Sequence, residues 1–222
     1  MAPSPTPGPD NPRLILASAS PRRRALLAMA GFVFDVVPPE VDEVVAAGEA
    51  PEVAVVRLAG EKAAAVLGRV APETCVLACD TIVVVDGEIL GKPGSTDEAV
   101  DMLLRLAGRA HRVLTGFVVT TPPDPAERPS TERGVAESVV TMTVVSRAEA
   151  VAYAGTGEPM DKAGAYALQG EGKRFVARVD GLRSNVVGLP LEVVVPILAR
   201  HGIHRAVGSA TNQRVGSPGG SP

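Results

Sequence analysis

The sequence of 222 residues has no tryptophan, and aromatic side chains make up only 3% of it. Its core must therefore be built from alanine, valine and leucine, which are part of a hydrophobic content of 45%. No apolar run approaches the roughly 20 residues of a membrane-spanning helix, and no secretory signal precedes the first expected strand. These absences argue against a membrane partner and favour a globular protein of the cytoplasm.

A large excess of charge is also absent, because the formal net charge is −3. The composition thus gives no reason to expect a nucleic acid partner, and any phosphate site must be local. The two cysteines, Cys75 and Cys79, lie four residues apart in an expected strand, about 13 Å from each other on one face. That separation excludes a disulfide, and two thiols are too few for a zinc site. Both are predicted to be core residues in a reducing compartment.

Hydrophobic runs and turn signals predict a mixture of strands, hairpins and helices along residues 13–207. Strands are expected over 14–17, 32–39, 109–121, 134–146 and 173–181, with a hairpin over 75–93 that turns at Asp86–Gly87. Helices are expected over 25–30, 51–70, 95–108, 146–157 and 189–202. This order predicts one α/β (mixed α+β) domain with a mixed sheet. Residues 1–12 and 208–222 are predicted to be disordered from their composition, and 121–134 to form an extended hairpin loop.

The first helix begins with an unusual concentration of arginine. Ser20 is a natural N-cap and Pro21 suits the first helical position. Arg22, Arg23 and Arg24 follow, where cations oppose the helix dipole. Either an anion such as phosphate binds at this helix start, or the arginines are solvated surface charges.

Other residues are unusual for the element in which they lie, or lie where functional residues often occur. Asp80 and Thr81 interrupt the apolar strand "CVLACDTIVVV", where a carboxylate must be paired, bound to metal or exposed in a cleft or at a sheet edge. Glu43 lies in a loop after a strand and is either functional or merely solvated. Lys62, in the middle of a helix, would by position alone be a surface lysine. Small residues around Gly164 allow close approach of another element or of a ligand.

Taken together and in order, these stretches resemble the Maf family of nucleotide pyrophosphatases. The resemblance rests on "LASASPRRRALL", "VDE", "EKA", "CDTIVVVDGEILGKP", "HRVLTG", "EPMDKAGAYALQGEG" and "NVVGLPL", and it covers residues 13–203. It implies an elongated mixed sheet flanked by helices, with two lobes around a central cleft, similar to the inosine-triphosphate pyrophosphatases. It also implies hydrolysis of a nucleoside triphosphate to monophosphate and pyrophosphate with a divalent cation, Mg²⁺ or Mn²⁺.

The same resemblance assigns roles to individual residues. Asp80 would be the proton acceptor that activates water, and Asp80 and Glu43 are the carboxylates expected near the metal. The residues expected to bind the substrate are Ser18, Ser20, Arg22, Arg23, Glu43, Lys62 and Lys92. The residues at the family's specificity positions are Arg22, Thr81 and Gln169, which agree with the branch that acts on dTTP and UTP.

The resemblance also implies alternative functions, further substrates and an oligomeric state. The chain could belong to the branch that acts on 7-methyl-GTP, or it could be a nucleotide-responsive binding protein that restrains septum formation. Modified pyrimidine nucleotides are further candidate substrates, in a house-cleaning role. A homodimer is expected from family likeness alone.

The segment "PPDPAERPSTER" within the expected loop 121–134 provides a test of the hairpin. Replacing it with a short Asn-Gly turn should change the free energy of unfolding by at most ~1 kcal/mol, because loop closure depends weakly on length. Urea denaturation measures this change. A large loss of activity in the shortened protein would show instead that the segment covers the cleft or joins a dimer interface.

Overall fold

The computed structural model describes residues 13–71, 74–121 and 130–206. The predicted disordered ends, 1–12 and 208–222, and most of the predicted loop 121–134 lie outside the described residues. The strands are β1 (Arg13–Ala17), β2 (Asp35–Val36), β3 (Thr74–Val85), β4 (Glu88–Leu90), β5 (Ala110–Thr120), β6 (Thr131–Met142) and β7 (Val176–Gly181). The α-helices are α1 (Pro21–Met29), α2 (Pro51–Leu67), α3 (Thr96–Leu106), α4 (Arg147–Ala154), α5 (Arg183–Val187) and α6 (Leu191–Arg200). Short 3₁₀ helices are η1 (Glu158–Asp161), η2 (Ala163–Ala165) and η3 (Glu171–Phe175).

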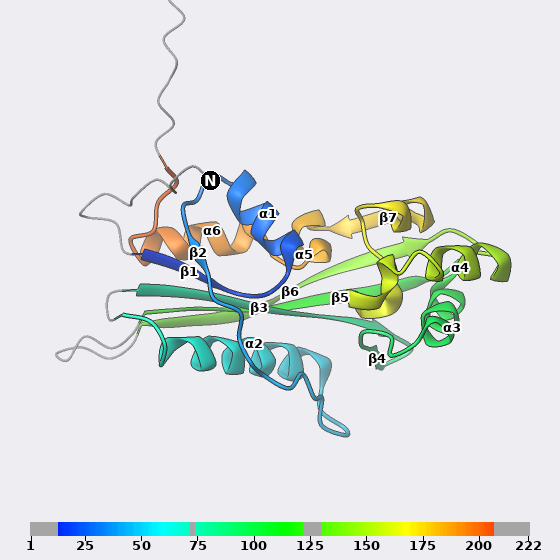
Figure 1. Cartoon of the computed structure of the whole chain (residues 1–222), viewed down its shortest axis with the longest axis horizontal. Coiled ribbons are helices and arrows are strands. Elements are labelled where there is room, and N and C mark those ends of the chain that lie inside the picture. Colours follow the sequence, from blue (N-terminus) through cyan, green and yellow to red (C-terminus); the bar gives the residue numbers. More distant parts are fainter. Residues whose placement is uncertain (1–12, 72–73, 122–129, 207–222) are drawn as a thin grey trace, which may run out of the picture.

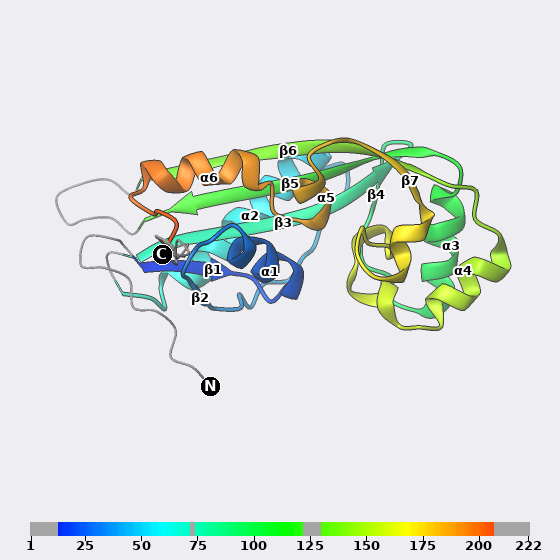
Figure 2. The ribbon, with the colours of Figure 1, turned by 90° about the horizontal axis from the view of Figure 1, so that it is seen from above.

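The strands form one mixed sheet in the order β2-β1-β3-β5-β6-β7, and β4 pairs with β3. β1 is parallel to its neighbours β2 and β3, whereas the pairs β3–β5, β5–β6 and β6–β7 are antiparallel. β3, β5 and β6 are long and run through most of the molecule (Figure 2). The predicted mixed sheet is confirmed.

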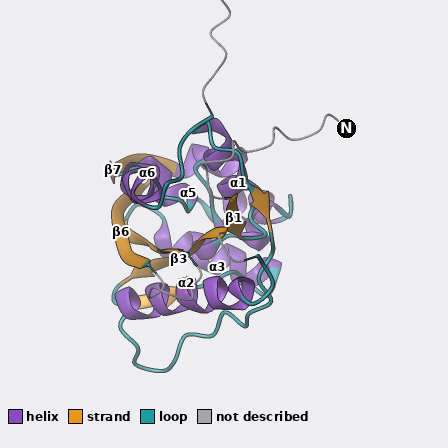
Figure 3. Ribbon diagram, turned by 90° about the vertical axis from the view of Figure 1, so that its left-hand side faces the viewer, coloured by secondary structure: helices purple, strands orange, loops and turns teal. Residues whose placement is uncertain are grey.

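Helices cover the two ends of this sheet differently. At one end α2 lies on one face, while α1, α5 and α6 lie on the opposite face (Figures 1 and 3). At the other end α3 and α4 form a second lobe with β4 and the 3₁₀ helices (Figure 2). Each lobe has its own core: Leu103, Tyr153 and Phe175 belong to the second one, and Leu27 and Leu77 to the first. The predicted elongated sheet with two lobes is therefore confirmed.

Glycine at position 116 allows α2 to pack unusually close to the sheet. Gly116 of β5 is paired with Asp80 of β3. A Cβ atom at Gly116 would lie 2.3 Å from the carbonyl oxygen of Val55 in α2, which is far inside contact distance. Only glycine permits this approach, which brings the backbone of α2 to the sheet beside Asp80.

Local signals at the ends of several elements are confirmed. The Ser20 side chain caps α1 by accepting a hydrogen bond from the backbone N–H of Arg23 at 3.4 Å, and Pro21 follows it. Asp86 and Gly87 both have positive φ, 53° and 80°, as a tight two-residue hairpin turn requires.

Some predicted boundaries are wrong. The strand expected over 32–39 is reduced to Asp35–Val36, since both residues are exposed and β2 pairs only with β1. Residues 131–133 of the expected loop 121–134 belong to β6, because they pair with the end of β5. The Asn-Gly replacement should therefore end before Thr131, so that this pairing is kept. The strand expected over 173–181 starts at Val176, after the 3₁₀ turn η3, and the short helix α5 was not predicted at all.

Among the described residues, no helix has the length and hydrophobicity that a membrane span would need. Cys75 and Cys79 are both fully buried in the core between the sheet and α1, as predicted. Burial raises the pKa of the Cys75 thiol to about 12 and that of Cys79 to about 11. Both are therefore protonated core residues at neutral pH.

A buried histidine on β5 makes the stability of the fold sensitive to pH. His111 is 3% exposed, and its Nε2 atom forms a 2.6 Å hydrogen bond with the Tyr166 hydroxyl. Burial lowers the pKa of His111 to about 4, below the value of about 6.5 expected in the unfolded chain. As the pH falls, the unfolded chain takes up the proton first. The contribution of His111 to stability is thus complete above about pH 6.5 and is lost as the pH approaches 4.

Lowering the pH from 7 to 5 should therefore destabilise the wild-type protein by about 2 kcal/mol more than a His111→Gln variant. Glutamine retains a hydrogen-bonding group toward Tyr166 but does not titrate. Urea denaturation at both pH values measures the difference. Parallel stability curves for the two proteins would contradict a neutral, buried His111.

Candidate active site

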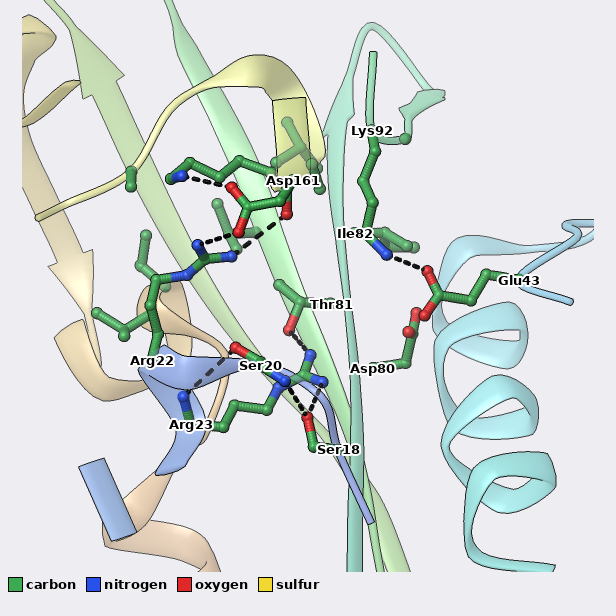
Figure 4. A pocket seen from close by; sticks show the side chains of 18 of the residues that line it. Ser18, Ser20, Arg22, Arg23, Glu43, Asp80, Thr81, Ile82, Lys92 and Asp161 are labelled. Carbon is green, nitrogen blue, oxygen red and sulfur yellow. Dashed lines mark hydrogen bonds and ion pairs between the residues drawn. The ribbon is translucent and has the colours of Figure 1, made fainter. Parts of the chain in front are cut away.

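A pocket of about 730 Å³ lies where the two lobes meet, along one edge of β3. β1 pairs with this edge as far as Ala78, and β4 pairs with the same edge from Val83 onward. Between them, Asp80, Thr81 and Ile82 line the pocket (Figure 4). The gap between two strands on one edge thus opens the middle of the longest strands to a ligand.

The alternation of side chains along β3 divides the polar residues between the two faces of the sheet. Asp80 shares its face with Ala78, which packs with the residues of α2. Thr81 shares its face with Cys79, which packs with α1. As a result, Asp80 contacts Lys62 of α2 and Thr81 contacts Arg23 of α1.

A chain of ion pairs connects Asp80 to the pocket mouth. The Lys62 ammonium donates to Oδ1 of Asp80 and, at 2.6 Å, to Oε1 of Glu43. Lys92 donates to Oε2 of Glu43, also at 2.6 Å (Figure 4). The side chains of Lys62 and Asp80 are 5% and 7% exposed, whereas that of Lys92 is 53% exposed. The sequence position alone suggested a surface lysine at 62, and this is wrong: α2 turns Lys62 inward.

The two lysines determine the charge state of Glu43. Partial burial raises the pKa of this carboxyl, but the hydrogen bonds and charges of Lys62 and Lys92 outweigh that effect and lower the pKa to about 2. Glu43 is therefore a carboxylate throughout the neutral range.

The donor set can be compared with the needs of a divalent cation. Lys62 contacts both Asp80 and Glu43, so oxygens of the two carboxylates lie within reach of one cationic centre. No group of three or more histidine, cysteine, aspartate or glutamate side chains suited to a metal is found in the described part of the chain. A cation such as Mg²⁺ or Mn²⁺ would have only these two carboxylates as side-chain ligands here, and phosphate oxygens and water would have to supply the rest.

The arginines at the start of α1 have three different environments. Arg22 donates to the Asp161 carboxylate at 3.0 Å, across the cleft between the lobes (Figure 4). Arg23 is 9% exposed and turns inward, where it donates to the Gly188 carbonyl, Ser18 and Thr81 at 2.7, 3.3 and 3.0 Å. Arg24 is exposed. The arginine charge is thus partly offset by a carboxylate of the second lobe, a contact that the sequence did not suggest.

The pocket brings together the predicted site residues, all of which line it: Ser18, Ser20, Arg22, Arg23, Glu43, Lys62, Asp80, Thr81, Lys92 and Gln169. Thr81 is hydrogen-bonded to Thr115 at 2.9 Å as well as to Arg23. Gln169 is exposed on the wall that belongs to the second lobe.

Sequence reasoning missed Asp161, which pairs with Arg22, and Tyr166, which lines the pocket and bonds to His111. The concentration of polar residues among the small ones over 158–172 was the available signal.

A pocket with cationic side chains around a buried carboxylate defines a site for an anionic, phosphorylated ligand. The protein belongs to the Maf family, whose model, described as Maf-like protein, matches residues 13–201.

Curated relatives are similar over nearly their whole length. A protein of Anaeromyxobacter dehalogenans (strain 2CP-C) is 49% identical over 196 residues, which cover 86% of this chain and 95% of that protein. A Myxococcus xanthus protein is 48% identical, with 87% and 95% covered, and one from Vibrio cholerae is 47% identical, with 81% and 92% covered. All three are named dTTP/UTP pyrophosphatase. A solved dITP/XTP pyrophosphatase of Mycobacterium abscessus matches 86% of this chain and 95% of its own at 15% identity, with a TM-score of 0.38.

Proposed function

We propose that this protein is a nucleoside triphosphate pyrophosphatase that hydrolyses dTTP and UTP, and modified pyrimidine nucleotides, to the monophosphate and pyrophosphate. The observation that carries the proposal is the buried Asp80–Lys62 pair on the pocket side of β3, next to Glu43 and Lys92. A base at Asp80 would there be surrounded by the cations that a polyphosphate requires. The dTTP/UTP pyrophosphatase name of relatives 47–49% identical supports the same reading.

In the proposed reaction, water adds across the anhydride bond between the α and β phosphates. Lys62 holds Oδ1 of Asp80 and so leaves Oδ2 to accept the proton of the attacking water. Because Lys62 is itself held by Glu43, the carboxylate and the ammonium keep a fixed relative position. Arg22 and Lys92 bind phosphate oxygens and neutralise the charge that develops on pyrophosphate as it leaves.

Asp80 and Glu43 would hold a divalent cation together with phosphate oxygens. Such a cation supplies charge neutralisation and polarisation of the phosphates.

Gln169 would read the base. Its side-chain amide offers both a donor and an acceptor, which match the O4/N3 edge of a uracil-type base. Arg22 and Thr81 complete the specificity positions. The cytoplasmic location and the homodimer expected from the sequence stay predictions. The alternative function is nucleotide binding without turnover, and pyrophosphate release by the purified protein would exclude it.

Asp80→Asn should lower pyrophosphate release by 10²–10⁴-fold, because a lost general base typically costs that much. Nucleotide binding should remain, since the amide has the same volume. Pyrophosphate release by the purified protein with Mg²⁺ and UTP measures the first effect, and calorimetric titration measures the second. The matched control is Asp101→Asn on the exposed face of α3, which should behave as the wild type. Normal turnover by Asp80→Asn would mean that the base is elsewhere, with Glu43 next.

Substrate preference tests the base contact. dTTP and UTP should be hydrolysed well ahead of ATP and GTP, and CTP should be weaker because its exocyclic amine reverses one donor–acceptor pair. Gln169→Ala should flatten this preference while leaving inhibition by inorganic tripolyphosphate unchanged, since the phosphates bind elsewhere. A comparison of kcat/KM over the nucleotide panel gives the answer. A preference for 7-methyl-GTP would assign the protein to the other branch of the family.

A further inference from the structure

The segment that carries Gln169 is held by hydrogen bonds on both sides of that residue. Before Gln169, the Tyr166 hydroxyl bonds to His111 at 2.6 Å, and the backbone N–H of Gly164 donates to the Gly91 carbonyl at 3.0 Å. After Gln169, the chain makes a tight turn through Gly170 into η3. The place of Gln169 on the pocket wall therefore depends on what holds this turn.

The carboxylate of Glu158 holds this turn. Glu158 accepts the backbone N–H of Glu171 on Oε2 at 3.0 Å and that of Gly172 on Oε1 at 3.1 Å. Oε1 also accepts the Tyr153 hydroxyl at 2.9 Å. Burial raises the pKa of Glu158, but the hydrogen bonds from the two N–H groups and from Tyr153 outweigh that effect. The pKa of Glu158 is therefore lowered overall. An ionised carboxylate is the acceptor that satisfies all three donors at once.

The glycines of the turn show how tightly it packs on this carboxylate. A Cβ atom at Gly170, where φ is +69°, would lie 2.6 Å from Oε2 of Glu158. A Cβ at Gly172 would lie 2.4 Å from the Tyr153 hydroxyl oxygen. The turn thus lies directly against the Glu158 and Tyr153 side chains, with no room for a side chain at positions 170 and 172.

Glu158 is itself fixed in place. Its backbone N–H donates to Thr156 at 3.2 Å, its carbonyl accepts from Lys162, and Tyr153 is fully buried in the core of the second lobe. The hydrogen bonds therefore connect a rigid core to Glu171 and Gly172, which follow Gln169 after one intervening residue, Gly170.

We infer that Glu158 is a positioning residue for nucleotide specificity, which acts by fixing the Gly170–Gly172 turn and through it Gln169. The inference rests on the proposed function, in which Gln169 reads the base. Asp80 and Lys62 lie on β3 and α2, away from this turn, so its loosening affects discrimination between bases more than the hydrolytic step.

The test compares Glu158→Gln with Glu149→Gln. An amide at 158 replaces one acceptor by a donor and so breaks a bond to the turn. Glu149 lies in the same lobe and also accepts a backbone N–H and a hydroxyl, both from Ser146, but it caps α4 and does not contact the turn. Glu158→Gln should reduce the ratio of kcat/KM for UTP over CTP by roughly three- to tenfold, the effect of one hydrogen bond. Glu149→Gln should leave the ratio unchanged.

Two further measurements separate positioning from general damage. In a Gln169→Ala background, Glu158→Gln should change the ratio by less than about twofold, because the residue through which it acts is already gone. The backbone amides of Glu171 and Gly172 should exchange faster with solvent in Glu158→Gln but not in Glu149→Gln. If Glu158→Gln fails to fold, Tyr153→Phe, which removes one bond to the carboxylate and keeps the ring, should shift the ratio in the same direction.

Equal losses for all nucleotides in Glu158→Gln, or the same loss with and without Gln169, would overturn the inference. The inference would also be overturned if Glu158→Gln kept the full preference for UTP while Gln169→Ala lost it. In that case the proposed function, in which Gln169 recognises the base, would still hold. A wild-type protein without any preference among nucleotides would instead overturn the proposed reading of the base itself.

Discussion

The site depends on two strands that share one edge of β3 without meeting. β1 ends opposite Ala78, and β4 begins opposite Val83. The residues between them are in the middle of a strand whose other edge is paired with β5, so their backbone is rigid while their side chains face a cavity. Strand alternation then sends Asp80 and Thr81 to opposite faces. One short gap thus gives a ligand access to both layers of helices.

The second constraint is the burial of Lys62, because an ammonium removed from water is costly unless it is fully paired. Two carboxylates pair with it, one from β3 and one from the loop before α2. This pairing requires α2 to lie close to the sheet, and the absence of a side chain at Gly116 allows that approach. A change at Gly116 would therefore act on the site through the helix, although the residue does not line the pocket.

Signals that depend on a few neighbouring residues predicted the structure well. The Ser20 cap, the Asp86–Gly87 turn and the apolar run of β3 are local, and all are confirmed. The inward orientation of Lys62 and the Arg22–Asp161 pair were not predictable in that way, since they depend on residues 18 and 139 positions away in the chain. The family resemblance named ten of the residues that line the pocket, but the contacts that position them, such as those of Glu158, emerged only from the fold.

The charges around the pocket bear on the need for a metal. The ionisable side chains that line it are Arg22, Arg23, Lys62, Lys92 and Lys162 on the cationic side, and Glu43, Asp80 and Asp161 on the anionic side. Ion pairs offset most of the cationic charge, since each carboxylate already contacts a lysine. The side chains alone therefore leave much of the negative charge of a nucleoside triphosphate unbalanced. In the proposed complex, Asp80 and Glu43 would hold a divalent cation, and its charge would balance part of what the side chains leave unbalanced.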